Sequence, residues 1–393
     1  MNQRQLFLQH LAQTSDFPLM LEIDRAEGIF LFDTSGKKYI DLISGIGVSN
    51  VGHRHPNVLA AIHAQLDKYL HTMVYGEYVQ SPQVMLAKAL ADTLPAPLES
   101  VYLVNSGSEA VEGAMKLAKR YTGRTEIISF QNAYHGSSQG ALSATGHEPF
   151  KQNFRPLIPG FRHIRFNEFV DLEFITTQTA AVLVEVIQGE AGVVPANMDY
   201  LKALRTKCDE TGTLLMFDEI QTGFGRTGTF WAFEQYEVAP DVLISAKGMG
   251  GGMPIGCFIS SNEIMSVFRN NPILGHISTF GGHPVSAASS LATLRTVLDD
   301  KLMADVIKKE ALFRSLLVHD KIKAIRSKGL MFAVEFDSFD VVKPIIDKAI
   351  DLGVITDWFL FNDYSMRIAP PLIIKEEEIK QACNIILQAC AEG

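Results

Sequence analysis

Asp241-Val-Leu-Ile-Ser-Ala-Lys247-Gly-Met-Gly-Gly-Gly252 places one lysine at the end of a short apolar run and follows it with small residues. The apolar run at 241–246 predicts a buried strand. The glycines after it have no side chains that could cover the Lys247 amine. A primary amine in such a position can form a Schiff base with a carbonyl compound. Most lysines beside glycines are exposed loop residues, so this interpretation depends on partners elsewhere in the chain.

Strands and helices alternate around this segment. Apolar runs predict strands at 101–104, 126–130, 180–186, 213–217, 241–246 and 256–260, and helical patterns lie at 108–120 and 200–210. Near-continuous apolar strands separated by helices indicate an α/β fold, with a mostly parallel sheet that is covered on both faces. Ligands of such sheets bind outside the carboxyl ends of the strands.

The pattern changes after about residue 300, where a smaller α+β unit is indicated. Its predicted strands lie at 323–336 and 366–370, and its predicted amphipathic helices lie at 339–352 and 376–391. A predicted hairpin at 22–41 is placed to pack with this unit. We therefore expect an N-terminal segment packing with the small domain, a large domain and a C-terminal small domain, at 1–45, 46–299 and 300–393.

Composition excludes several classes of protein. The chain has 393 residues, of which 47% are hydrophobic and 20% charged, as in ordinary globular proteins. Its formal net charge of -9 argues against a nucleic-acid partner. The four cysteines lack CxxC spacing and the eleven histidines lack an HExxH pattern, so we expect neither a disulfide framework nor a metal site. Without a signal-peptide core or a bilayer-length apolar run, we expect a cytoplasmic protein with no membrane partner.

Polar side chains follow several predicted strands. In Asn105-Ser-Gly-Ser108, between a strand and a helix, free N–H groups would attract a phosphate, Gly107 permits close approach and Ser108 adds a hydroxyl. The alternative is an ordinary N-cap serine. Asp218 ends a buried strand, where a carboxylate needs a cationic partner such as a protonated pyridine nitrogen, unless it caps a helix.

Two further side chains suit a planar cofactor and an acidic substrate. Tyr134 follows a strand and a turn, from where its ring can stack on another ring or pack in the core. Arg367 carries a fork of N–H donors that suits a carboxylate, although a solvated strand arginine is the alternative.

Three motifs together resemble the class III aminotransferases: Asp218-Glu-Ile-Gln-Thr-Gly-Phe-Gly-Arg-Thr-Gly228, Ser245-Ala-Lys-Gly248 and Ser278-Thr-Phe-Gly-Gly282. The resemblance covers nearly the whole chain and includes residues 45–56. Residues 188–192 and 367–372 are similar to the ornithine and acetylornithine aminotransferase branch. The resemblance implies a pyridoxal 5'-phosphate enzyme of fold type I (aspartate-aminotransferase-like), with a large, mostly parallel-sheet domain and a smaller α+β domain.

By this resemblance, Lys247 holds the cofactor as a Schiff base and Asp218 pairs with the pyridine nitrogen. The residues expected to contact the cofactor are Gly107, Ser108, Tyr134, His135, Asp218, Gln221, Lys247 and Thr279. Thr279 is expected to reach the phosphate of the neighbouring subunit, which implies a homodimer with shared active sites. Glu185 is similar to a supporting carboxylate of the family.

The resemblance also implies a substrate switch. Glu190 masks Arg367 while an ω-amine reacts, and releases it for the α-carboxylate of glutamate. Tyr75, and Tyr78 near it, are candidates for contacting the substrate tail, with core or interface packing as the alternative.

One position departs from the family. Ser137 stands where many relatives carry an arginine that holds a substrate carboxylate. Arg155, Arg162 and Arg165 are possible replacements, but we favour surface positions for them. His283 stands where Asn is commoner.

We therefore expect a pyridoxal-phosphate-dependent aminotransferase of amino-acid metabolism with ping-pong kinetics. The donor would be ornithine, N-acetylornithine or a similar diamino acid and the acceptor 2-oxoglutarate. The alternatives are a class III ω-transaminase for another amine, a decarboxylase, racemase or aminomutase of the same family, a non-catalytic cofactor-binding protein, and an unrelated α/β enzyme.

Overall fold

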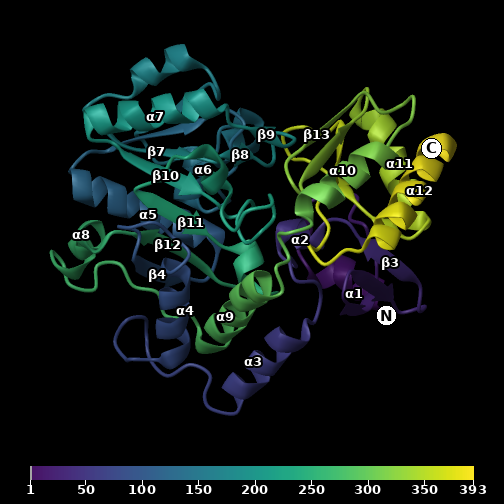
Figure 1. Cartoon of the computed structure of the whole chain (residues 1–393), viewed down its shortest axis with the longest axis horizontal. Coiled ribbons are helices and arrows are strands. Elements are labelled where there is room, and N and C mark those ends of the chain that lie inside the picture. The colour runs from purple at the N-terminus through teal and green to yellow at the C-terminus, as the bar shows by residue number, and fades with distance from the viewer. Residues whose placement is uncertain (1) are drawn as a thin grey trace.

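The computed structural model describes residues 2–393 and has two lobes (Figure 1). The larger lobe is built on a seven-stranded sheet of order β4-β12-β11-β10-β7-β5-β6. Its strands are β4 (Ser100–Val104), β5 (Glu126–Phe130), β6 (Phe161–Ile164), β7 (Thr179–Val184), β10 (Leu214–Asp218), β11 (Val242–Ser245) and β12 (Gly256–Ser260). Neighbouring strands are parallel except at β12, which is antiparallel to both β11 and β4. The predicted fold class is confirmed, although the sequence patterns missed the edge strand β6.

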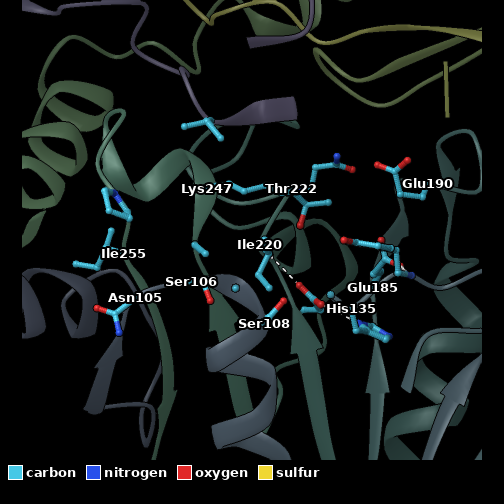
Figure 2. Close-up of a pocket in the computed structure, with 18 of the residues that line it drawn as sticks. Asn105, Ser106, Ser108, His135, Glu185, Glu190, Ile220, Thr222, Lys247 and Ile255 are labelled. Carbon is cyan, nitrogen blue, oxygen red and sulfur yellow. Dashed lines mark hydrogen bonds and ion pairs between the residues drawn. The ribbon is translucent and has the colours of Figure 1, made fainter. Parts of the chain in front are cut away.

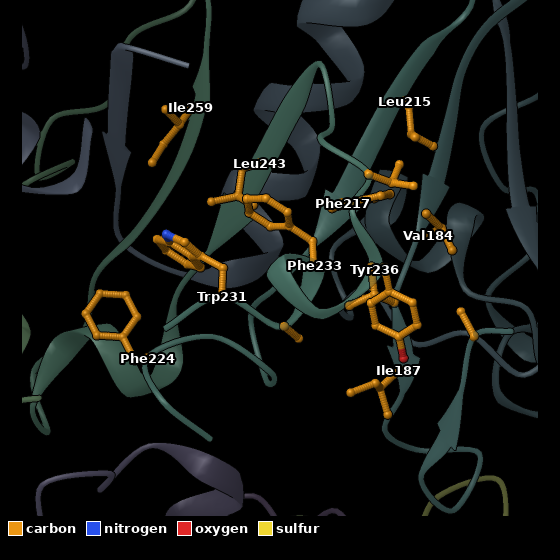
Figure 3. Close-up of a cluster of buried hydrophobic side chains, with 14 of the residues drawn as sticks. Val184, Ile187, Leu215, Phe217, Phe224, Trp231, Phe233, Tyr236, Leu243 and Ile259 are labelled. Carbon is orange, nitrogen blue, oxygen red and sulfur yellow. The ribbon is translucent and has the colours of Figure 1, made fainter. Parts of the chain in front are cut away.

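Apolar side chains cover both faces of this sheet. Along β10, Leu215 and Phe217 enter one core cluster while Met216 enters the other, because successive side chains point to opposite faces. Figure 3 shows the first cluster, with Trp231 and Phe233 closing it from the loop after β10. The opposite face is covered by α5 (Gly107–Thr122). The sheet is thus buried on both sides, and only its strand ends are open to ligands.

Further helices and short strands complete this lobe. They are α2 (Ser44–Gly47), α3 (Pro56–Leu66), α4 (Ser81–Ala91), α6 (Gln139–Ala144), β8 (Ile187–Gln188), β9 (Val194–Pro195), α7 (Met198–Thr211), α8 (Asn262–Met265) and α9 (Pro284–Asp299). The long helix α9 packs against α3 and α4.

The smaller lobe holds an antiparallel sheet of order β13-β14-β17-β16. Its elements are α10 (Val306–Leu316), β13 (Ala324–Ser327), β14 (Phe332–Glu335), α11 (Phe339–Asp351), β15 (Val354–Ile355), β16 (Asp357–Trp358), β17 (Ser365–Ile368) and α12 (Glu376–Glu392). The expectation of one strand over 323–336 is wrong, because the chain turns between β13 and β14. The turn contains Gly329, which has φ +59° and lies so close to the Thr227 backbone that a Cβ atom would clash.

The N-terminal region also differs from the expected hairpin. After α1 (Gln3–His10), three strands form two successive hairpins: β1 (Ile23–Glu27), β2 (Phe30–Asp33) and β3 (Lys38–Asp41). Strand β3 pairs in parallel with β15, which attaches this sheet to the smaller lobe. Both termini lie on that side of the molecule (Figure 1). Among the helices of residues 2–393, none has the length and apolarity needed to cross a membrane.

Candidate active site

A cavity of about 460 Å³ opens at the carboxyl ends of the large sheet (Figure 2). The loops after β4, β5, β10 and β11 line it, as expected for an open α/β sheet. Nine residues singled out from the sequence meet there: Gly107, Ser108, Tyr134, His135, Glu185, Glu190, Asp218, Gln221 and Lys247.

Lys247 is separated from β11 only by Ala246 and has a left-handed backbone, with φ +45°. Such a backbone is uncommon for a residue with a side chain, and the packing around it must maintain it. Close packing is visible at Gly248, where a Cβ atom would lie 2.6 Å from the Asn50 side chain. Burial lowers the pKa of the Lys247 amine, and the nearby Glu190 carboxylate opposes this effect. A depressed pKa increases the fraction of neutral, nucleophilic amine.

The start of α5 forms the anion-binding end of the cavity. Ser106 is the N-cap of this helix, and its side chain accepts a hydrogen bond from Glu109 N at 3.2 Å. The N-cap alternative therefore applies to Ser106 and not to Ser108. First-turn N–H groups have no carbonyl partner within a helix and attract anions. Gly136 leaves room beside them, because a Cβ atom there would lie 2.2 Å from Ser108 Oγ.

Asp218 lines the same cavity, as the last residue of β10. Its Oδ2 lies 2.8 Å from His135 Nδ1, and its Oδ1 accepts from Ile220 N at 3.1 Å. His135 is fully buried and its Nε2 has no hydrogen-bond partner within residues 2–393. The histidine thus lies behind the carboxylate and orients it, so that Asp218 remains a candidate acceptor for a ligand N–H.

These groups fit the pyridoxal phosphate expected from the sequence. An anion-binding helix start, an aldehyde-reactive amine and a buried carboxylate all line one cavity. A Cβ atom at Gly107 would clash with Ile220 and one at Gly136 with Ser108, so both glycines allow the close packing of the loops that line the cavity. Tyr134 lines the same cavity, and its hydroxyl lies 3.2 Å from Ser137 Oγ.

Glu185 supports this arrangement through hydrogen bonds to the backbone. Its carboxylate accepts hydrogen bonds from Tyr134 N and Gly189 N, both at 2.9 Å. Burial raises the pKa of Glu185 to about 7, and the nearby His135 lowers it in part. Glu185 therefore ties the loop that carries Tyr134 to the backbone at Gly189.

A second cavity, of about 420 Å³, adjoins the first and shares Tyr134, Glu190 and Lys247 with it. Arg367 lines this second cavity and contacts Glu190 through two bonds, Nη1–Oε1 at 2.7 Å and Nη2–Oε2 at 3.1 Å. Both side chains are almost completely buried. The pair predicted from the sequence is thus formed and closed in this structure.

Tyr75 lies outside both cavities of its own chain. Its hydroxyl donates to Val101 O at 3.2 Å and accepts from Leu103 N at 3.3 Å, while its ring packs 4.4 Å from Tyr102. Within its own chain Tyr75 therefore packs against β4, which is the alternative given for it, and contact with a substrate stays a prediction. The hydroxyl is fully used by backbone groups, which the sequence could not indicate.

Tyr78 and Thr279 are exposed on the surface. The carbonyl of Thr279 accepts from His71 Nε2 at 2.8 Å. Thr279 is therefore absent from the cavity of its own chain, and only a second protomer could bring it to such a site.

The arginines proposed as replacements at Ser137 are engaged elsewhere. The three arginine side chains are exposed. Arg155 forms an ion pair with Glu148, Arg162 with Glu126 and Arg165 with Asp171. The surface interpretation is confirmed. The ring of His283 caps α9 by accepting from Val285 N at 3.3 Å.

Two residues that shape the site were not predicted from the sequence. Glu112 accepts from Ser138 Oγ and Gly140 N, both at 2.7 Å, and so holds the loop that carries Gly136. Asp357 binds Arg367 Nε at 2.9 Å. Glu112 has no signal beyond its helical position, and Asp357 lies in a two-residue strand without a pattern of its own.

The chain is similar to known proteins over almost its whole length. Residues 11–390 match the family described as Aminotransferase class-III. The acetylornithine aminotransferase of Methanopyrus kandleri is 39% identical over 376 residues, which cover 95% of this chain and 94% of that protein. That of Methanocaldococcus jannaschii is 38% identical over 402 residues, covering 98% and 96%.

Solved structures agree with these matches. The ornithine aminotransferase from Toxoplasma gondii ME49 has a TM-score of 0.92 and 30% identity, and the alignment covers 100% of this chain and 96% of that one. An (S)-enantioselective ω-transaminase from Thermomicrobium roseum has a TM-score of 0.89 and 28% identity, with coverage of 100% and 98%.

Proposed function

The chain belongs to the class-III aminotransferases, and we propose that it moves the side-chain amine of ornithine, N-acetylornithine or a similar diamino acid to 2-oxoglutarate. It is a pyridoxal-phosphate-dependent enzyme. The cofactor supplies an aldehyde for the substrate amine and a ring that takes up the electrons released at the reacting carbon. The acetylornithine aminotransferases of similar sequence support this choice of donor.

The closed Glu190–Arg367 pair beside Lys247 is the observation that carries the proposal. A donor that brings an ω-amine to the cofactor site at Lys247 has no carboxylate on its reacting carbon, so it needs no cation there. A 2-oxo acid or an α-amino acid has a carboxylate at that position and needs the guanidinium. Movement of Glu190 away from Arg367 would let one site serve both substrates in turn, as ping-pong transfer requires.

Lys247 is proposed to move the proton. Once the substrate amine has displaced it, its Nζ is a base for the proton on the carbon that bears the amine, because burial lowers its pKa. Asp218 is proposed to accept a hydrogen bond from the ring nitrogen and to keep a proton there by its negative charge. His135 holds this carboxylate at 2.8 Å.

We also propose a homodimer in which Thr279 of one protomer reaches the start of α5 in its partner. Exposed apolar side chains lie close to Thr279 in the sequence, including Ile273 (72% exposed), Ile277 and Phe280. Large apolar patches of this kind mark interaction surfaces. Sedimentation of the holoenzyme tests the assembly, and a monomer that retains full activity would contradict it.

The division into 1–45 with 300–393, and 46–299, is proposed as the domain organisation. The β3–β15 pairing supports it. A cytoplasmic location is proposed because Cys208, Cys257, Cys383 and Cys390 are buried free thiols, which suits a reducing compartment.

The test of the proposed function is glutamate formation. The holoenzyme is mixed with 2-oxoglutarate and ornithine or N-acetylornithine, and glutamate is measured. Lys247→Ala should abolish turnover while still binding the cofactor noncovalently, and borohydride reduction should place a pyridoxyl group on Lys247. A Lys247→Ala variant with a near-native rate would refute the role of the lysine, and absence of glutamate with every diamino acid would refute the donor class.

A second candidate is an ω-transaminase for amines without a carboxylate. Within residues 2–393, Lys247 and Arg367 are the only lysine or arginine side chains that line the two cavities. No second guanidinium is therefore present for a distal carboxylate, and Ser137 is exposed where relatives carry one. Faster turnover of carboxylate-free amines than of diamino acids would favour this candidate.

A further inference from the structure

We propose that Asp357 is a positioning residue, which holds the Arg367 guanidinium in place while Glu190 and a substrate carboxylate exchange on its other edge. The inference rests on the proposed function, because that function requires Arg367 to meet a carboxylate. Asp357 plays no part in the roles assigned above to Lys247 and Asp218.

The two carboxylates use different parts of the guanidinium. Asp357 Oδ1 binds Nε at 2.9 Å, whereas Glu190 binds Nη1 and Nη2. The carbonyl of Trp358 accepts a further bond from Nη2 at 3.0 Å. Because a guanidinium has only five N–H groups in a fixed plane, these partners fix its orientation as well as its position.

The partners also come from different parts of the molecule. Asp357 lies directly opposite Arg367 in the register of β16 and β17, so the two share one small sheet. The Phe359 ring lies 4.5 Å from the guanidinium carbon. Glu190 reaches the pair from the loop after β8 in the larger lobe. Departure of Glu190 would therefore leave the bonds to Asp357 and Trp358 intact.

Once Glu190 has moved away, the Nη1 and Nη2 edge of Arg367 would remain directed at the cavity that contains Lys247. Without Asp357, the guanidinium would keep only the Trp358 carbonyl and could rotate about its side-chain bonds. An incoming carboxylate would have to order it again, and ordering a long side chain costs binding free energy. Asp357 thus prepares the site for the second substrate.

The charge of Asp357 contributes less than its position. In the closed pair, Arg367 contacts the carboxylates of Asp357 and Glu190. When a substrate carboxylate replaces Glu190, Arg367 contacts that carboxylate and Asp357, so the number of negative charges around it is unchanged. The negative charge of Asp357 therefore acts almost equally on both states. Burial raises the pKa of Asp357, with Arg367 opposing, and its side chain is 23% exposed to the second cavity. A neutral residue that still accepts from Nε should serve as well.

The experiment compares Asp357→Ala and Asp357→Asn with the wild-type holoenzyme. Glutarate is the probe, because it has two carboxylates and no carbonyl group that could react, and its binding is measured by calorimetric titration. The free energy that it costs to order one long side chain on binding corresponds to up to about tenfold weaker binding. We expect Asp357→Ala to bind glutarate about tenfold more weakly and to raise the KM for 2-oxoglutarate alike, with kcat and the KM for the amine unchanged.

Asp357→Asn should restore the wild-type affinity, because its amide oxygen still accepts from Nε. Asp347→Ala is the matched control, since Asp347 is a surface aspartate paired with Lys343 in the same lobe. Equal glutarate affinity in wild type and Asp357→Ala, no glutarate binding by the wild type, or an Asp357→Asn variant as weak as Asp357→Ala would each overturn the proposal. A lowered kcat with unchanged KM would overturn it as well.

Failure of the proposed function is distinguishable from these outcomes. If no diamino acid is turned over, the donor assignment fails. The glutarate titration still reports on Asp357 in that case, because it needs no turnover.

Discussion

Replacing Glu190 by glutamine is expected to make the enzyme bind carboxylates more tightly. Glu190 occupies the edge of Arg367 that a substrate carboxylate would need, through bonds of 2.7 and 3.1 Å. Its Oε2 also accepts from Leu360 N at 3.1 Å. A substrate carboxylate must break this arrangement before it can bind. A glutamine keeps the shape and one acceptor oxygen, but has no charge to hold the guanidinium.

The magnitude follows from the ion pair. Two unit charges about 4 Å apart attract by roughly 4 kcal/mol at an effective dielectric constant of about 20. The glutamine oxygen retains part of this attraction, so we take about half of it as the free energy released. About 2 kcal/mol corresponds to a roughly 30-fold lower dissociation constant for glutarate. Arg367 keeps Asp357 as its counter-ion, so the change leaves no unpaired buried charge.

Calorimetric titration with glutarate measures this effect, and the KM values for 2-oxoglutarate and glutamate should fall in parallel. The KM for the diamino acid should change less, because its ω-amine end does not need Arg367. Glu148→Gln is the control, since it breaks a glutamate–arginine pair at the exposed surface. Unchanged or weaker glutarate binding in Glu190→Gln would refute the idea that Glu190 competes with substrate.

Three further changes test other parts of the molecule. Gly136→Ala should weaken cofactor binding by about tenfold or more, because φ is +127° and the new Cβ atom would meet Ser108 Oγ. Gly36→Ala is the control, because Gly36 has φ +85° but open space around it, and it should not change the cofactor dissociation constant measured by absorbance. Equal weakening by Gly136→Ala and Gly36→Ala would contradict the proposed clash with Ser108. Burial raises the pKa of Glu219 from 4.5 to about 7, so the stability that its proton contributes is present at low pH and is lost as pH rises through 7. Relative to Glu219→Gln, the wild-type free energy of unfolding should therefore fall by roughly 2 to 3 kcal/mol between pH 5 and pH 8, and a constant difference in denaturant titrations would argue against it. Ser137→Arg should lower the KM for N-acetylornithine by about tenfold through a new charge-assisted bond, whereas an unchanged KM would show that its carboxylate lies elsewhere.

The residues around Lys247 were predictable because of one general property of parallel sheets. Ser108, Asp218 and Lys247 each follow a buried strand, and the carboxyl ends of these strands meet at one edge. Their mutual approach therefore follows from the strand pattern. The assignment to a particular cofactor came from the resemblance of the motifs to a family.

The other parts of the site do not follow from the strand pattern, for physical reasons. Arg367 belongs to a different sheet, so no strand pattern relates it to Lys247. Asp357 faces Arg367 through the register of a two-residue strand, which is too short to show alternation. The orientation of Tyr75 depends on backbone groups of β4 that only the folded chain brings near. Helix α9 was missed because it buries several serines and threonines, which hide its amphipathic period.

The placement of Arg367 relative to Lys247 depends on Arg226, a fully buried side chain of the loop after β10. Its guanidinium donates to the carbonyls of Leu330 and Pro370 in the smaller lobe and to Asn50 in the larger one. Pro370 lies three residues beyond Arg367, so this buried group joins the strand that carries Arg367 to the loop that follows Asp218. Separating the lobes would break the bonds of this guanidinium to Leu330 and Pro370, which is costly. We therefore expect the site to alternate between its two substrates through a local movement of Glu190, while Asp357 and the sheet that contains both residues hold Arg367 in place.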